Sequence, residues 1–359
     1  MAYEKHILTG GPNELINLLR AYAVNCGWTI LVENDDLAID GSGSIDGRRL
    51  VLQSPSGKTF ASFRSANGKK IFNTQAAVGS GLGLVCAAGF QEFPASGFWY
   101  DQPGATKATN QEVVGVGIPV QPATTQTVYF NHIHDPAELI LISVEVIDKT
   151  YQHMAVGEVQ KVGSWTGGTI YSASRNSANM FSAFDTVSLE NNSNHLFGLS
   201  QNASTFLRAD IDAAPLRVPE VLWASGGPNT GGVTAGYTGK TLALPVMNIN
   251  CLNAAWLPKV PHYGYLQSQN ATDTGRNVNT LNCISVNLPL AVYVQRDPDS
   301  LMNFSQCGYV PGVCFISTRN LAPGQIYNVN YPASDTTYQA FPQTRRGGPM
   351  GYDGIAILQ

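Results

Sequence analysis

Two histidines separated by one residue are the most distinctive candidates for chemistry in the sequence. His132 and His134 flank Ile133, and Asp135 follows at once. On a β-strand, side chains two residues apart share a face, so two imidazoles could bind a metal ion or join a histidine cluster on the axis of a trimer. The same segment is expected to form the turn of a hairpin, where exposed polar residues are ordinary. We therefore expect no metal site here.

Carboxylates occur as tight pairs at two further places, Asp210 with Asp212 and Asp297 with Asp299. Either pair could bind calcium, or could serve a glycosidase if its carboxyl groups were about 5–9.5 Å apart across a sugar. Sequence spacing does not define that separation. The tryptophans and tyrosines could stack on sugars, although core and interface positions are the better explanation of these aromatic residues. An extracellular polysaccharide-degrading enzyme is therefore an alternative interpretation.

Other catalytic and cofactor motifs do not match. The glycine-rich GSGLG at residues 79–83 has Leu84 where a dinucleotide-binding loop needs its last glycine, and no G-x-S-x-G or P-loop sequence occurs. The six cysteines contain no C-x-x-C pair, which predicts buried free thiols rather than a metal tetrad or redox motif. The sequence thus predicts no catalytic residue, no cofactor and no metal.

The elements that position these residues begin with one helix. Apolar residues recur at spacings of three and four from Leu15 to Tyr22, with Pro12 suited to the first turn and Gly27 to the residue after the helix. A helix from about Pro12 to Cys26 should bury Leu15, Leu18, Leu19 and Tyr22 against a sheet. Strand-like runs follow, and Asn67-Gly68 predicts a hairpin between residues 60–66 and 69–73. We expect residues 1–120 to form one α+β domain, with the helix on an antiparallel meander.

The rest of the chain predicts β-structure throughout. TVYF and LILISVEVI form a long hairpin over residues 121–161, part of a C-terminal β-domain. Residues 162–260 predict a loop-rich β insertion, and residues 261–359 a C-terminal β segment that completes the domain. The fold class is mainly β, an α+β unit followed by a sandwich or barrel with long loops.

The hairpin is also the candidate assembly contact. A long apolar hairpin is a poor surface for a free monomer, and we expect contacts at Tyr129, Phe130, Ile133 and His134. The alternative is that the hairpin forms the core of its own domain, because LILISVEVI is apolar on both faces.

Charge is scarce in this chain. Of 359 residues only 13% are charged, against about 25% in an average soluble domain, and the net charge is −4. Nucleic acid is therefore not expected as a partner, because no overall positive field would hold a phosphate backbone.

We expect no membrane span, since no run approaches 18 apolar residues. We also expect the chain to fold in the cytoplasm, since the N-terminal residues lack a secretory pattern. A surface with few charges fits a protein covered by neighbours in an assembly.

Three stretches together resemble structural proteins of tailed bacteriophages: the N-terminal helix running into GWTIL and LVLQSPSGKTFASFRS, residues 128–161, and the segment from LPLAVYVQRD to the terminal YDGIAILQ. The resemblance implies a non-enzymatic virion component of the tail, baseplate or neck, made in the host cytoplasm. Its partners would be copies of itself, three or six by the symmetry of tails, and other virion proteins. A receptor-binding tail protein that takes a host surface glycan is the first alternative, and the polysaccharide-degrading enzyme is the second.

Overall fold

The structure is a computed structural model that describes the following residues: 2–37, 45–69, 82–89, 99, 116–120, 125–147, 150–173, 175–176, 205–211, 214–218, 242–244, 287–295, 304–317, 321–330, 335–342 and 353–359. The described chain is mainly β, with one helix near the N-terminus and antiparallel sheets. The predicted fold class is thus confirmed.

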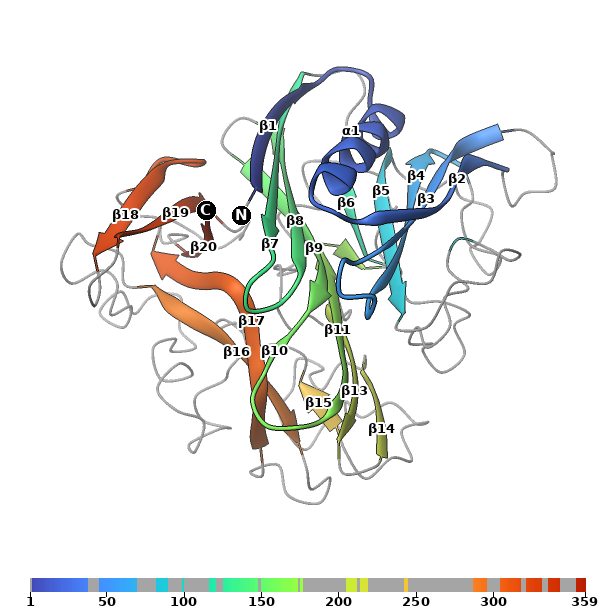
Figure 1. Cartoon of the computed structure of the whole chain (residues 1–359). Helices are drawn as coiled ribbons and strands as arrows, with labels where there is room; N and C mark the ends of the chain where they lie inside the picture. The colour runs from blue at the N-terminus through green and yellow to red at the C-terminus, as the bar shows by residue number, and fades with distance from the viewer. Residues whose placement is uncertain are drawn as a thin grey trace, which may run out of the picture.

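The described strands form three sheets, which Figure 1 shows. The central sheet has the order β1(Ala2–Leu8), β7(Gln126–Ile133), β8(Leu139–Ile147), β9(Thr150–Glu158), β11(Thr166–Ala173), β13(Thr205–Ile211), β14(Ala214–Val218). The N-terminal sheet has the order β12(Arg175–Asn176), β6(Val116–Pro119), β5(Leu82–Gly89), β4(Phe60–Asn67), β3(Ile45–Gln53), β2(Thr29–Leu37). The C-terminal sheet has the order β15(Leu242–Leu244), β16(Leu288–Gln295), β17(Phe304–Ser317), β20(Asp353–Leu358), β19(Asp335–Pro342), β18(Ile326–Asn330), and β10(Gln160–Lys161) also pairs with β17.

The central sheet lies between two hydrophobic cores and contributes one face to each of them. Alternate residues of a strand point to opposite faces, and β8 places Ile140 and Ile142 in one core and Leu139 and Leu141 in the other. Side chains of the helix and of the N-terminal sheet complete the first core, and side chains of the C-terminal sheet complete the second. The apolar run LILISVEVI therefore belongs to a strand that is buried on both faces.

Helix α1(Pro12–Asn25) lies over the N-terminal sheet beside β1, as Figure 1 shows. Leu15, Leu19 and Tyr22 are buried, and Leu18 packs partly buried against the same core, which confirms the predicted helix and its apolar face. The helix ends in a Schellman motif: the amide of Gly27 donates to the carbonyl of Val24, and that of Trp28 donates to the carbonyl of Ala23. Gly27 has a φ of +85°, so a residue without a Cβ suits this position.

The predicted hairpin between residues 60–66 and 69–73 is wrong in the part that the structure describes, and residues 70–73 lie outside the described residues. Strand β4 pairs with β3 on one side and with β5 on the other, where Asn67 lies opposite Leu82. Gly68 does take the positive φ expected of a turn residue, +94°. The turn after β4 therefore leads to a more distant strand, and β5 has the sequence LGLVCAAG, whose glycines and alanines have low β-propensity.

Strand pairing crosses the boundaries predicted for the domains. From the predicted first domain, β1 joins β7 in the central sheet, and β6 pairs with β12 at residues 175–176. Strands β11, β13 and β14, which lie in the predicted insertion, continue the central sheet beyond β9. Three of the predicted segments thus share one sheet.

The four described cysteines, Cys26, Cys86, Cys307 and Cys314, form no disulfide bond, and all but Cys26 are buried. Cys251 and Cys283 lie outside the described residues. Within the described part of the chain, no helix is long and apolar enough to cross a membrane.

Candidate functional site

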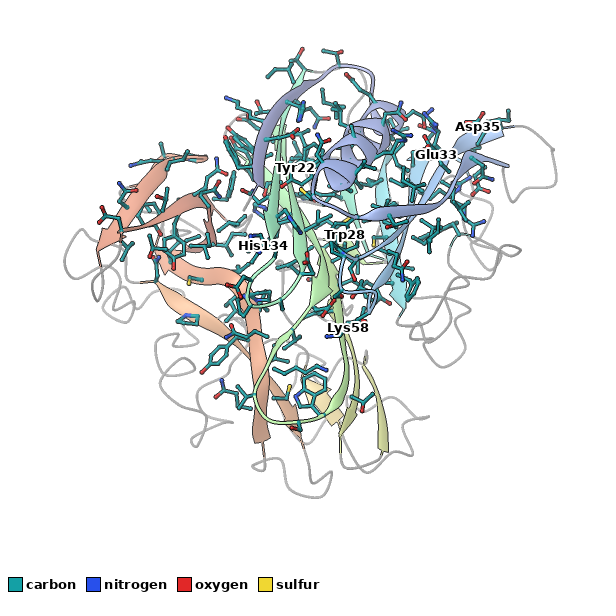
Figure 2. The ribbon with its side chains drawn as sticks, viewed as in Figure 1. Tyr22, Trp28, Glu33, Asp35, Lys58 and His134 are labelled. Atoms are coloured by element: carbon teal, nitrogen blue, oxygen red, sulfur yellow. The ribbon has the colours of Figure 1, made fainter. Side chains whose placement is uncertain are left out.

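The four residues predicted as an assembly contact lie at two depths. Tyr129, Phe130 and Ile133 are buried, the last two with no exposed surface, while His134 is exposed at the β7–β8 turn (Figure 2). Phe130 packs in the first core and Tyr129 and Ile133 pack in the second. The three buried side chains therefore contact the chain's own core, as the alternative interpretation of the hairpin expects. Of the four predicted contact residues, only His134 in the turn is exposed to solvent.

A histidine–carboxyl pair closes the base of this turn. Nε2 of His132 lies 2.7 Å from Oε2 of Glu138, and both side chains are nearly buried. Burial, with a smaller contribution from His134, lowers the pKa of His132 to about 4. Burial, and next the negative charge of Glu158, raise the pKa of Glu138 to about 7. Near pH 6 the pair therefore holds a protonated carboxyl that donates to a neutral imidazole.

A second carboxylate, that of Glu158, lies beside the pair and joins two sheets. Oε1 of Glu158 at the end of β9 accepts hydrogen bonds from the hydroxyls of Ser56 and Ser54, which belong to the β3–β4 turn of the N-terminal sheet. The amide of Glu158 donates to the carbonyl of Glu138 at 2.7 Å. Gly157 allows this approach, because a Cβ at that position would collide with the carbonyl oxygen of Glu138.

The C-terminal sheet reaches the same junction through β10. Gln160 and Lys161 pair with β17, and the indole N–H of Trp165 donates to the carbonyl of Cys307 at 3.0 Å. Nζ of Lys161 lies 4.7 Å from the centre of the Trp165 ring. Burial, and next the positive charge of Lys58 (Figure 2), lower the pKa of Lys161. We call the set His132, Glu138, Glu158, Ser54, Ser56, Lys58, Lys161 and Trp165 the three-sheet junction.

Chemically, the three-sheet junction offers two carboxyl groups in different environments. Burial raises the pKa of Glu138 to about 7, and the carboxyl group of Glu158 accepts hydrogen bonds from the hydroxyls of Ser54 and Ser56. Both carboxyl groups, however, already bond to the chain's own side chains, and Lys161 covers one face of Trp165. The geometry therefore favours a cross-link among the three sheets over a site that holds a sugar.

Serine and histidine also meet elsewhere, in the interior. Oγ of Ser143 lies 2.8 Å from Nδ1 of His153, directly across β8 and β9. The pair resembles a nucleophile and its base, but both residues are buried and the His153 ring packs edge-on against Phe341, with ring centres 5.7 Å apart. It satisfies polar groups inside the second core. Only the strand register, which places position 143 opposite 153, would have revealed it from sequence.

The predicted histidine pair and the two aspartate pairs complete the candidate groups. His132 and His134 do lie close, with ring centres 6.2 Å apart. Among the described residues no group of three or more His, Cys, Asp or Glu could hold a metal ion. The side chains of the pairs Asp210–Asp212 and Asp297–Asp299 lie outside the described part of the structure.

Comparison with known proteins adds no assignment. No protein-family model matches the chain, and no curated protein matches it.

Replacing Glu138 with glutamine tests the titration of the junction. In an unfolded chain a glutamate ionises near pH 4.3, whereas folded Glu138 does so near pH 7. The protonated form of Glu138 therefore stabilises the folded chain fully below about pH 4.3, and this stabilisation is lost as the pH rises through 7. Glu138→Gln, which keeps a donor toward His132, should gain stability over the wild type by on the order of 2 kcal/mol between pH 4 and 7.5. Urea unfolding at several pH values measures this, and a difference that does not change with pH would contradict it.

Proposed function

We propose that this chain is a non-enzymatic structural component of a bacteriophage particle, in the tail, baseplate or neck, and that it acts by assembling with copies of itself and with other virion proteins. Its resemblance to structural proteins of tailed phages gives the proposal its biological setting. Its scarcity of charge favours close contact between copies, because like-charge repulsion is small.

The observation that carries the proposal is the exposure of large apolar side chains at sheet edges. Tyr3 and Ile7 lie on β1, Leu31 on β2 and Ile326 on β18, and each of these strands ends its sheet among the described strands. An edge strand leaves a row of backbone N–H and C=O groups without partners in its sheet, which is a ready template for another chain. Apolar side chains beside such a row gain free energy when a neighbour covers them.

Mass spectrometry of gradient-purified particles tests the proposal. We expect the chain in particles of the phage that encodes it, in a constant multiple relative to the other structural proteins. Washing at high salt should leave that ratio unchanged, because contacts made by apolar burial and backbone pairing are not screened as surface charges are. Loss of the chain from washed particles would contradict the proposed function.

A further inference from the structure

The edges of the three sheets are protected unequally. Natural sheets discourage pairing with other chains by placing charges or proline on edge strands, or by keeping those strands short. All but one of the edge strands described here have such a device: β1 has Glu4 and Lys5, β2 has Glu33, Asp35 and Asp36, β14 has Pro215 and Arg217, and β10, β12 and β15 have two or three residues each.

Strand β18 is the exception. Its sequence, Ile326 to Asn330, is IYNVN, with neither a charged residue nor a proline. Ile326 is 51% exposed and Asn328 is exposed as well. Figure 1 shows β18 at the outer margin of the molecule, beside β19 and away from the central sheet.

The backbone of β18 presents donors and acceptors outward at alternate residues. The amide of Gln359 donates to the carbonyl of Thr337, so Thr337 bonds toward β20, and Thr337 with its partner Asn328 forms a non-hydrogen-bonded pair of the β18–β19 ladder. Hydrogen-bonded and non-bonded pairs alternate in an antiparallel ladder. The N–H and C=O groups of residues 326, 328 and 330 therefore point away from β19.

We propose that this edge binds the same edge of a second copy of the chain, as an antiparallel pair across a two-fold axis at Asn328. This pairing places Ile326 opposite Asn330 and Tyr327 opposite Val329, and Asn328 faces its own copy. Every outward N–H of one strand then meets an outward C=O of the other. The Tyr327–Val329 pair is of the aromatic and β-branched kind that stabilises sheets.

Charge identifies a second copy as the occupant. When a strand pairs with itself, its central residue meets an identical residue. The same operation would bring Lys5 against Lys5 on β1 and Glu33 against Glu33 on β2, and like charges directly opposite are destabilising. On β18 the central residue is a neutral amide. The central residue of β14, Leu216, is also neutral, but that strand carries Pro215 and Arg217, so β18 is the described edge of five or more residues that can pair with itself without a charge or a proline.

This inference rests on the proposed function, since it names a contact through which copies join, yet the two can fail separately. A chain that dimerises through β18 but is absent from particles would refute the virion role alone. A chain that is present in particles but does not self-associate through β18 would refute this contact alone.

Two substitutions at one position give the test. Asn328→Asp keeps the oxygen that accepts the hydrogen bond of the Thr337 hydroxyl, 3.0 Å away, and places two negative charges face to face across the axis. Asn328→Lys places two positive charges there. Sedimentation of the whole chain over a range of concentrations should show dimers for the wild type, and each variant alone should associate at least about tenfold more weakly.

Mixing the two variants in equal amounts is the decisive measurement. Opposite charges then face each other, so dimers should return to at least the wild-type level. The matched control is Asn25→Asp, which makes the same chemical change at an exposed position at the end of α1 and should dimerise as the wild type does. A monomeric wild type, variants that dimerise unchanged, or a mixture that fails to recover would each overturn the proposal. Matching far-ultraviolet circular dichroism spectra of all four chains establish that folding is intact.

Discussion

Replacing Ile133 with lysine is expected to prevent folding of the whole chain. Ile133 has no exposed surface and packs in the second core, where its side chain reaches the backbone of β17 at Gly312. An ammonium group there would lose its hydration without gaining a partner, a cost of several kcal/mol against a total stability of about 5–15 kcal/mol. Circular dichroism and sedimentation of the expressed chain should show unfolded or aggregated protein.

The matched control is one residue away. His134→Lys places the same group on an exposed position of the same turn, so the chain should fold with an unchanged melting temperature. A soluble, folded Ile133→Lys chain would mean that the turn of the hairpin is not packed on the C-terminal sheet.

Truncating Leu19 to alanine should give the second large effect. Leu19 is fully buried between α1 and the N-terminal sheet, and removal of a buried leucine side chain costs about 2–5 kcal/mol through lost transfer free energy and the cavity left behind. Chemical denaturation of the whole chain measures the loss. Leu18→Ala, on the half-buried side of the same helix, should cost clearly less. Equal losses for the two variants would show that the helix is turned differently.

The helix and its buried face could be predicted because their signals are local. Spacing of leucines, a proline in the first turn and a glycine after the last all act within one segment, and the Schellman bonds of Gly27 and Trp28 complete them. The hairpin at Asn67-Gly68 was predicted wrongly for the complementary reason. A turn sequence sets the local φ, but the strand that pairs with β4 is chosen by core packing, and β5 supplies Leu84 and Cys86 to that core.

The candidate site was harder to predict, since its members come from separate segments. The apolar run LILISVEVI does not show whether its hairpin packs inside the chain or against a neighbour, so the depths of Tyr129 and Phe130 on the paired strand could not be predicted. The bonds between Glu158 and the hydroxyls of Ser54 and Ser56 join segments about a hundred residues apart. The residue spacing within either segment does not predict these contacts. The two segments meet only because of the order of the strands in the sheets.

The pairing of β1 with β7 also determines when the fold can close during synthesis. Ala2 lies opposite His132, so β1 leaves the ribosome well before its partner strand β7 is made. At typical elongation rates of about 5–20 residues per second, this delay is on the order of ten seconds. Helix α1 meets Phe130 only when the same strand arrives. Helix α1 and strands β2 to β4 therefore keep apolar side chains uncovered until β7 has been made.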